Sequence, residues 1–413
     1  MTMATSSPVR ERLEELKTIA GLTGIPEPPI KEVHVFWLAG MSCDGCTIAV
    51  TGATAPSIEE LLTGAIPGLP RVILHHPVIA VEAGEDFVAW YYKAWRGELG
   101  APYVVVLEGS VPDESRAQRT GGYWAALGVE GADPWMAQPV SVNEWLRRLA
   151  PGAAAMIAIG TCATWGGVPA AAGNITGSMS LMDFLGPNYK SALGLPVINI
   201  PGCSPVGDNF TETVAAILLY LVGLGPAPEF DELGRPKWLF SETVHRHCVL
   251  AGYYEEGTFA EAFGERRCLV KVGCWGPVVQ CNIVSRGAIR GKGGCMKVGG
   301  VCIGCTMPGF PDKFAPFYKT PPGATFSSLF SKAVGFLMRK LRRISMSERN
   351  WTPLWDRKGA VPTPWGKPSR KSWFHRLVDS FYRWWQYRGS VRLDKWQTYE
   401  EKEREMEVIW MGR

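Results

Sequence analysis

The distribution of eleven cysteines restricts the fold of this 413-residue chain more than any other feature. Four of them follow short apolar runs in the first half of the chain, and the other seven lie between residues 245 and 311 among many glycines. Residues 1–30 contain neither an apolar segment nor paired arginines, so we expect no export signal and a reducing compartment. Cysteines there serve metal or redox chemistry rather than disulfides, and an odd number would leave one unpaired in any case.

Short β-rich runs alternate with helical stretches through the first half of the chain. The runs, which we expect to be strands, are Val33–Leu38, Val72–Leu74, Tyr103–Leu107, Ala155–Ile159 and Val197–Ile200. Strands that alternate with helices form a parallel, doubly wound α/β sheet, and functional groups collect at the carboxyl ends of its strands. The longest apolar stretch, from Val214 to Leu224, is shorter than the roughly 18 to 20 residues of a membrane span.

Four cysteines follow three of these runs. Cys43 and Cys46 form a Cys-x-x-Cys pair after the first run, Cys162 follows the fourth run and Cys203 follows the fifth. A doubly wound sheet brings such positions to one edge, where neighbouring Gly and Pro residues let the backbone approach closely. A structural zinc ion or a redox dithiol would also use a Cys-x-x-Cys pair, but four thiols at strand ends favour an iron–sulfur cluster.

A second group combines His245 and Cys248 with Cys268 and Cys274. A neutral imidazole among thiolates lowers the negative charge of the site, which suits a cluster near the surface. His247 competes with His245 for this role, and the spacing alone is also compatible with a zinc ion bound by three cysteines and a histidine.

The last four cysteines, Cys281, Cys295, Cys302 and Cys305, form a third group that ends in Cys-Ile-Gly-Cys. The three groups together use all eleven cysteines, which favours a series of redox centres over a single catalytic cluster. Residues 245–311 show little periodicity, so we expect a small, irregular domain organised around clusters rather than around an apolar core.

Charge divides the chain into regions with different roles. Residues 313–413 carry a net charge of +12 and eight of the seventeen tryptophans but no cysteine, whereas residues 1–312 carry a net charge of −8. We expect four parts: an N-terminal arm at 1–30, the α/β domain at 31–233, the cluster domain at 234–312 and a helical tail over the remainder.

Two stretches of the tail place apolar residues at helical spacing. The residues that we expect to contact a membrane or a partner are Phe326, Leu329, Phe330, Leu337, Trp373, Trp384 and Trp385. Basic helices with boundary tryptophans suit an anionic membrane surface. Packing on a partner protein or on a second copy is the alternative, and nucleic-acid binding is not expected because no recognised binding motif accompanies the charge.

The order and spacing of the motifs resemble the small, electron-transferring subunits of nickel–iron hydrogenases. The matching motifs are Cys43-x-x-Cys46, Glu108-Gly109-Ser110 with Pro112, Gly160-Thr161-Cys162-Ala163, Pro201-Gly202-Cys203, Val244-His245-x-x-Cys248, Cys268-Leu269, Gly273-Cys274-x-Gly276-Pro277 and Cys302-Ile303-Gly304-Cys305-x-x-Pro308-x-Phe310. They span about residues 30–312 and leave the tail outside. The missing export signal, and the lack of two extra cysteines in the first motif, are similar to the actinobacterial-type, high-affinity class, for which oxygen tolerance is expected.

The resemblance implies a flavodoxin-like sheet and assigns the first thiol group to a proximal cluster, nearest the nickel site. It assigns the second group to a distal cluster and the third to a medial one. Many relatives have a proline where this chain has Cys295, and they bind a three-iron medial cluster. A fourth thiolate here implies a [4Fe-4S] cluster, as at the other two sites, with [3Fe-4S] as the alternative. The Cys281 region is shifted from the usual spacing, so its assignment is the least secure.

Asp44 stands inside the first motif, where relatives commonly have a small polar residue. Asp is well suited to cap the helix that follows, which is one interpretation. The other is that its carboxylate reaches a proximal iron, since a hard anionic oxygen favours ferric iron and would help the enzyme to survive oxygen. Glu108 is not expected to be catalytic.

The same resemblance implies the function. The nickel–iron centre that binds and splits H2 sits in a separate large subunit, so we expect a heterodimer and a higher oligomer of heterodimers. The chain would relay electrons from H2 oxidation to an acceptor such as quinone or the respiratory chain, in the cytoplasm or at the inner face of the membrane. The rival interpretations are a relay subunit of a respiratory quinone reductase and a zinc-stabilised scaffold.

Overall fold

The computed structural model describes most of the two expected domains and part of the tail. The described residues are 29–119, 121–131, 136–321, 335–337, 340–341, 344, 373–374, 377–378 and 380–381. The N-terminal arm lies almost entirely outside them. So do five of the tail residues that we expect at a membrane or partner, namely Phe326, Leu329, Phe330, Trp384 and Trp385.

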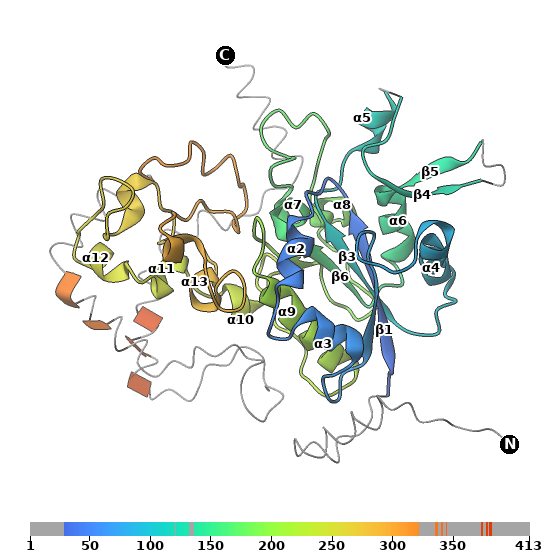
Figure 1. Cartoon of the computed structure of the whole chain (residues 1–413), viewed down its shortest axis with the longest axis horizontal. Helices are drawn as coiled ribbons and strands as arrows, with labels where there is room; N and C mark the ends of the chain where they lie inside the picture. Colours follow the sequence, from blue (N-terminus) through green and yellow to red (C-terminus); the bar gives the residue numbers. More distant parts are fainter. Residues whose placement is uncertain are drawn as a thin grey trace.

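A five-stranded parallel sheet forms the α/β domain (Figure 1). Its strands are β1 (Glu32–Ala39), β2 (Arg71–His75), β3 (Tyr103–Glu108), β6 (Ala155–Ile159) and β7 (Ile198–Ile200). Their order across the sheet is β2-β1-β3-β6-β7, and every neighbouring pair is parallel. This is the doubly wound order of flavodoxin-like folds, so the expected fold class and the five expected strands are confirmed.

Helices cover both faces of the sheet because its strands are almost continuously apolar. One face packs on α2 (Gly45–Thr51), α3 (Ile58–Thr63) and α9 (Gly207–Leu221). The other packs on α4 (Gly84–Arg96), α6 (Val142–Leu149) and α8 (Leu181–Leu185). The apolar stretch that begins at Val214 is therefore the second half of α9 and the turn after it, and the helix is buried from Gly207 to Leu219.

Three further elements of this domain surround the carboxyl edge of the sheet or extend from it. They are α5 (Glu114–Gln118), α7 (Gly160–Trp165) and an antiparallel hairpin of β4 (Ala126–Glu130) and β5 (Gln138–Ser141). The sequence did not predict the hairpin, because its residues are largely exposed and form no apolar run.

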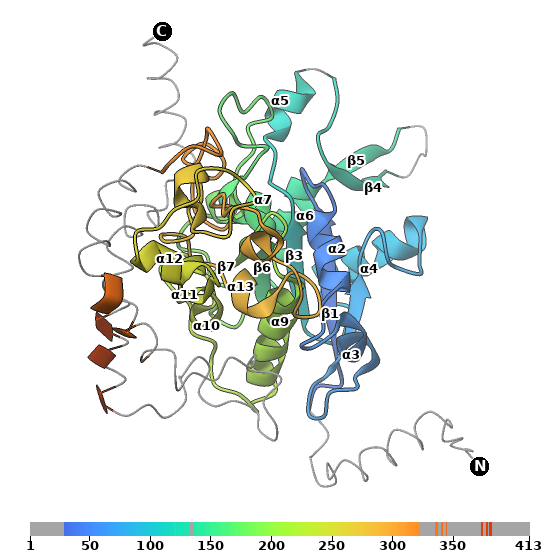
Figure 2. The ribbon, with the colours of Figure 1, turned by 60° about the vertical axis from the view of Figure 1, so that its left-hand side comes forward.

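The cluster domain is built from short elements that lie beside α7 and α9, on the side away from the hairpin (Figures 1 and 2). They are α10 (Lys237–Phe240), α11 (Val244–His247), α12 (Ala251–Glu255), η1 (Leu269–Val272), α13 (Ile283–Arg286) and η2 (Cys295–Val298). The expected irregular domain is confirmed in form. Its interior is mixed, however, since the buried cysteines pack among Val279, Met307, Phe310 and Phe314 rather than replacing an apolar core.

Residues 313–321 of the tail form turns, whereas the described pieces from residue 335 onward are helical and carry exposed apolar side chains. Leu337 is 57% exposed and Trp373 is 71% exposed, whereas Val378 is buried. Within the described part of the chain, no helix has the length and apolar character needed to cross a membrane.

Candidate iron–sulfur sites

The sheet brings the first thiol group together at its carboxyl edge. Cys43 and Cys46 lie at the junction of β1 and α2, Cys162 lies in α7 directly after β6, and Cys203 follows β7. Burial is the largest factor that raises the pKa of the Cys46 thiol, and the charges of Glu108 and of the other three cysteines raise it further. Four thiols that are distant in sequence therefore share one electrostatic environment, as the strand-end positions predict.

Glycines let the backbone lie directly against these sulfurs. A Cβ atom on Gly160 would stand 2.3 Å from the Cys46 sulfur, and one on Gly167 would stand 2.8 Å from the Cys162 sulfur. Both glycines also have positive φ values, +83° and +59°, which side chains disfavour. The site is therefore a cradle of backbone and sulfur into which no further side chain fits at these two positions.

Glu108, at the end of β3, anchors the loop that carries the Cys-x-x-Cys pair. Its buried carboxylate accepts hydrogen bonds from the backbone N–H groups of Cys46 (3.0 Å) and Thr47 (3.3 Å), from the Thr47 hydroxyl and from Trp37 Nε1 (3.0 Å). A carboxylate that is only 1% exposed is held in place by four donors, so Glu108 fixes the conformation of this loop.

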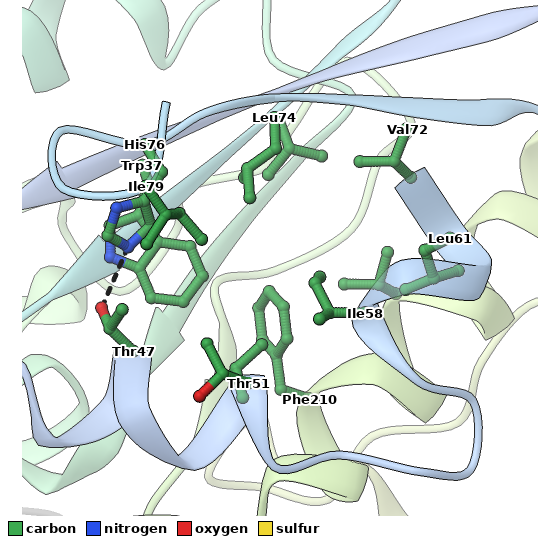
Figure 3. Close-up of a pocket in the computed structure, with 13 residues that line it drawn as sticks. Trp37, Thr47, Thr51, Ile58, Leu61, Val72, Leu74, His76, Ile79 and Phe210 are labelled. Carbon is green, nitrogen blue, oxygen red and sulfur yellow. Dashed lines mark hydrogen bonds between the residues drawn. The ribbon is translucent and has the colours of Figure 1, made fainter. Parts of the chain in front are cut away.

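His76 continues this network behind the site (Figure 3). Its Nδ1 accepts the backbone N–H of Val78 at 3.1 Å, so its Nε2 carries the proton and donates to the Thr47 hydroxyl at 2.9 Å. Burial lowers the pKa of His76 to about 4, which keeps the ring neutral. Figure 3 shows His76 and Thr47 at one end of a small, mostly apolar cavity of about 20 Å³ beneath α2. Sequence reasoning missed this network, although His75 and His76 directly follow an expected strand.

Asp44 does not cap the helix that follows it. It occupies the N-cap position of α2 with a left-handed backbone, at φ 58°, but its side chain makes no capping hydrogen bond. Its backbone N–H donates to the Ser42 hydroxyl at 3.1 Å, and its side chain is exposed beside Cys43. The capping interpretation is therefore wrong for this structure.

The second group comes together at the far end of the cluster domain. Burial raises the pKa of Cys268 to about 12, with further contributions from the charges of Cys274 and Cys248. The ring of His245 is buried and lies edge-on to Tyr254, with ring centres 4.5 Å apart, and Tyr254 packs against the apolar cluster that contains Cys268. His247 instead contacts the Glu242 carboxylate at 2.5 Å, which favours His245 as the histidine of this group.

The third group lies between the other two. Burial raises the pKa of Cys281, and the charges of Cys305 and Cys295 raise it further. Burial likewise raises the pKa of Cys302, and the charges of Cys274, Cys305 and Cys281 raise it further. The structure thus places Cys281 with the last three cysteines, which is the grouping that sequence spacing left least secure.

Hydrogen bonds connect each group to the next. The Thr161 hydroxyl, beside Cys162 of the first group, donates to the backbone carbonyl of Cys305 in the third group. The backbone N–H of Cys302, in the third group, donates to the Cys274 sulfur of the second group at 3.4 Å. The three groups therefore form one continuous series, in the order first, third, second.

Backbone donors aimed at the sulfurs indicate what these groups can hold. N–H groups of Leu250 and Gly276 donate to the sulfurs of Cys248 and Cys274, both at 3.4 Å, and the N–H of Cys302 donates to Cys274 at the same distance. Such N–H···S bonds stabilise the thiolates of iron–sulfur clusters and tune their potentials. Among the described residues, no three His, Cys, Asp or Glu side chains are close enough to hold a single metal ion. The thiol sets, the N–H donors and the glycine cradle fit iron–sulfur clusters.

Comparison with known proteins identifies the class to which this arrangement belongs. Residues 240–318 match the family described as the C-terminal part of the NiFe/NiFeSe hydrogenase small subunit, and residues 43–217 match "NADH ubiquinone oxidoreductase, 20 Kd subunit". The second match covers only the α/β domain that the two families share, so the first decides between hydrogenase and quinone reductase.

Individual relatives agree with this class. The chain is 32% identical over 290 residues to the periplasmic [NiFeSe] hydrogenase small subunit of Desulfomicrobium baculatum, covering 70% of this chain and 87% of the relative. It is 32% identical over 315 residues to the hydrogenase-2 small chain of Escherichia coli K12, covering 75% and 73% of the two chains. A solved actinobacterial-type NiFe-hydrogenase from Ralstonia eutropha H16 aligns with a TM-score of 0.72 and 50% identity, over 84% of this chain and 99% of that one.

The chain belongs to the small subunits of nickel–iron hydrogenases. It is the electron-transferring partner of a large subunit that carries the nickel–iron centre, and it acts as part of a hydrogenase.

Proposed function

We propose that this chain conducts electrons released by H2 oxidation through three iron–sulfur clusters, which its three thiol groups hold in the order proximal, medial and distal. The observation that carries the proposal is the series of hydrogen bonds between neighbouring groups, from the Thr161 hydroxyl, beside Cys162, to the Cys305 carbonyl and from the Cys302 N–H to the Cys274 sulfur. The loops that carry neighbouring ligand sets are therefore in direct contact, which suits electron transfer from one cluster to the next.

The proximal end faces the partner. Cys43 and Cys203 are exposed, and around them Ile48 is 65% exposed and Val168 is 55% exposed. Exposed apolar side chains beside thiols that would bind a cluster indicate a surface covered by another protein. We assign this edge of the sheet to the large subunit, which would also shield the proximal cluster from water.

The four thiols of the third group support a [4Fe-4S] medial cluster, since Cys295 and Cys281 both lie with the Cys302–Cys305 pair. A three-iron cluster would be the result if Cys281 did not bind. The proximal and distal groups each supply four ligands and are assigned [4Fe-4S] clusters too.

Asp44 supports a further assignment at the proximal site. With no capping bond to make, its exposed carboxylate remains available beside Cys43 as an additional ligand to a proximal iron when the cluster is oxidised. Asp44→Asn keeps the shape of the side chain but not its charge. We expect it to alter the spectrum of the oxidised proximal cluster and to shorten survival of activity in air, and unchanged spectra would refute the assignment.

The distal end and the tail are the parts of the chain on which we base our proposals for the acceptor, the assembly and the location. A respiratory acceptor such as quinone would be reached from the distal cluster. The exposed Leu337 and Trp373 support contact of the tail with the inner face of the membrane or with another heterodimer in a larger, cytoplasmic complex. The 50% identity to the actinobacterial-type enzyme supports placing this chain in the same class, and oxygen tolerance stays a prediction.

Metal analysis of the natively purified heterodimer tests the function. We expect about one nickel per heterodimer, from the centre in the large subunit, and about twelve irons from three four-iron clusters. Iron without nickel would support an electron relay but not a hydrogenase. Zinc in place of iron would refute the proposal.

A further inference from the structure

Cys281 lies at the junction of the two domains, and both residues beside it are held by side chains from elsewhere. Asn282 pairs with Asn209 of α9, and Gln280 pairs with Arg235, which lies before α10. The other members of the third group are not flanked in this way by any hydrogen bond to α9 among those observed in the described residues.

The pairing with α9 is reciprocal. Asn209 Nδ2 donates to Asn282 Oδ1 at 3.0 Å, and Asn282 Nδ2 donates to Asn209 Oδ1 at 2.7 Å. Two carboxamides that both donate and accept fix each other's planes. Asn282 stands at the N-cap of α13 but makes no capping bond with its side chain, which is committed to the buried Asn209 instead.

Asn282 transmits this constraint to the sulfur. Asn282 directly follows Cys281 in the chain. Burial raises the pKa of the Cys281 thiol, and the backbone N–H groups of Ile283 and Asn282 act in the opposite direction. The orientation of these N–H groups relative to the sulfur depends on how residue 282 is held, and residue 282 is held by Asn209. Hydrogen bonds to ligand sulfurs stabilise the negative charge of a reduced cluster and so raise its potential.

Arg235 secures the other side of Cys281. Its Nη2 donates to Gln280 Oε1 at 2.5 Å, while its Nε is held by Asp231 Oδ2 at 2.8 Å. The Thr306 hydroxyl donates to the Gln280 carbonyl at 2.7 Å, which joins this loop to the one that carries Cys305. The backbone on both sides of Cys281 is therefore fixed.

We propose that Asn209 is a positioning residue of the medial cluster: through Asn282 it fixes the Cys281 thiolate and its N–H donors, and so sets the cluster's reduction potential and retains its fourth iron. This inference rests on the proposed function, because it requires a cluster bound by the third thiol group.

The test compares Asn209→Leu with the wild type as purified heterodimers, by redox titration followed by electron paramagnetic resonance and by iron analysis. We expect the medial midpoint potential to fall, the proximal and distal potentials to stay unchanged, and part of the medial clusters to show the signal of an oxidised three-iron cluster. Cluster iron should fall from about twelve towards about eleven per chain.

Two further variants separate positioning from general destabilisation. Asn282→Ala removes the other half of the pair from a less buried position, so it should give the same shift, and the double variant should be no worse than either single one. Thr211→Val is the matched control, because it removes a buried hydroxyl from the same turn of α9 without touching the pair. It should lower stability and leave the medial potential unchanged.

The outcomes are distinct. If Asn282→Ala leaves the medial potential and the iron content as they are in Thr211→Val, the pair is only structural and the inference is wrong, whether or not Asn209→Leu folds. If the wild-type heterodimer itself lacks three clusters, the proposed function fails instead.

Discussion

Single residues at the proximal edge determine how closely the backbone approaches the sulfurs, and Gly160 is the sharpest case. It has φ +83°, and a Cβ atom would stand 2.3 Å from the Cys46 sulfur. We expect Gly160→Ala to displace Cys46 and to remove the proximal cluster, so that about a third of the cluster iron is lost. Iron analysis of the heterodimer measures this.

Gly97 provides the matched control for that substitution. It has a similar φ of +72°, but a Cβ atom there would meet nothing within 4 Å. Gly97→Ala should therefore cost only the backbone strain, about 1 kcal/mol, and keep the full iron content. Equal iron loss in both variants would show that strain, rather than contact with the sulfur, causes the effect.

Glu108 influences the same site through its charge. Its carboxylate touches the N–H groups of Cys46 and Thr47, and its charge contributes to raising the pKa of Cys46 after burial. Reduction adds negative charge to a cluster, so a nearby carboxylate opposes it. Glu108→Gln should therefore raise the midpoint potential of the proximal cluster, which redox titration of the heterodimer measures.

Glu114, a second buried carboxylate, provides the control, because its replacement also removes a charge but at a position away from Cys46. Glu114 accepts the backbone N–H groups of Trp124 and Ala125, both at 3.0 Å, and is not among the groups that shift the pKa of Cys46. Glu114→Gln should leave the proximal potential unchanged. A proximal potential that does not rise in Glu108→Gln, or that falls, contradicts the electrostatic role.

At the scale of elements, α9 and α13 are joined by a buried ion pair as well as by the asparagine pair. Arg286 of α13 contacts the Glu212 carboxylate of α9, which also accepts Trp238 Nε1 at 2.8 Å. Arg286→Met leaves the carboxylate buried without its partner, and we expect a loss of about 3 to 5 kcal/mol. The apparent melting temperature of the heterodimer should fall accordingly.

Replacing both members of the ion pair tests whether the pair itself stabilises the fold or whether only an unpaired buried charge is costly. In Glu212→Leu/Arg286→Met neither charge of this pair remains buried, so much of the lost stability should return, apart from the cost of losing the hydrogen bond from Trp238 Nε1 to Glu212. A double variant less stable than Arg286→Met would mean that the pair contributes more than it costs to bury.

Some elements of the fold could be predicted from the sequence and others could not. The five strands and the convergence of the first thiol group were predictable, because buried parallel strands are apolar runs and their carboxyl ends share an edge. The β4–β5 hairpin was not, since neither strand is buried. The partners of Glu108 and Asn209 were not predictable either. Single polar residues in apolar segments show no periodicity, and only the tertiary fold brings Asn282 to Asn209 or His76 to Thr47.

At the scale of the whole molecule, the three thiol groups would form a conduction path with two different ends once the proposed clusters are bound. The proximal end lies at the carboxyl edge of the sheet, where Cys43, Cys203 and Ile48 are exposed. The distal end lies in the cluster domain, where the N–H of Cys302 in the third group donates to the sulfur of Cys274 in the second. In the proposed function, electrons that enter at the sheet edge would therefore cross from one domain to the other before they leave.

The surface at which electrons enter can be tested through assembly with the large subunit. Ile48 projects from α2 beside the Cys-x-x-Cys pair, and Ile48→Asp would bury a charge in the proposed interface at a cost of about 2 to 5 kcal/mol. We expect the nickel recovered with a tagged small subunit to fall at least about tenfold, because about 1.4 kcal/mol changes an equilibrium constant tenfold. Val129→Asp is the control, since Val129 is similarly exposed but lies on the β4–β5 hairpin, away from the thiol groups (Figure 1). Nickel retained in Ile48→Asp, or lost equally in Val129→Asp, would place the large subunit on another face.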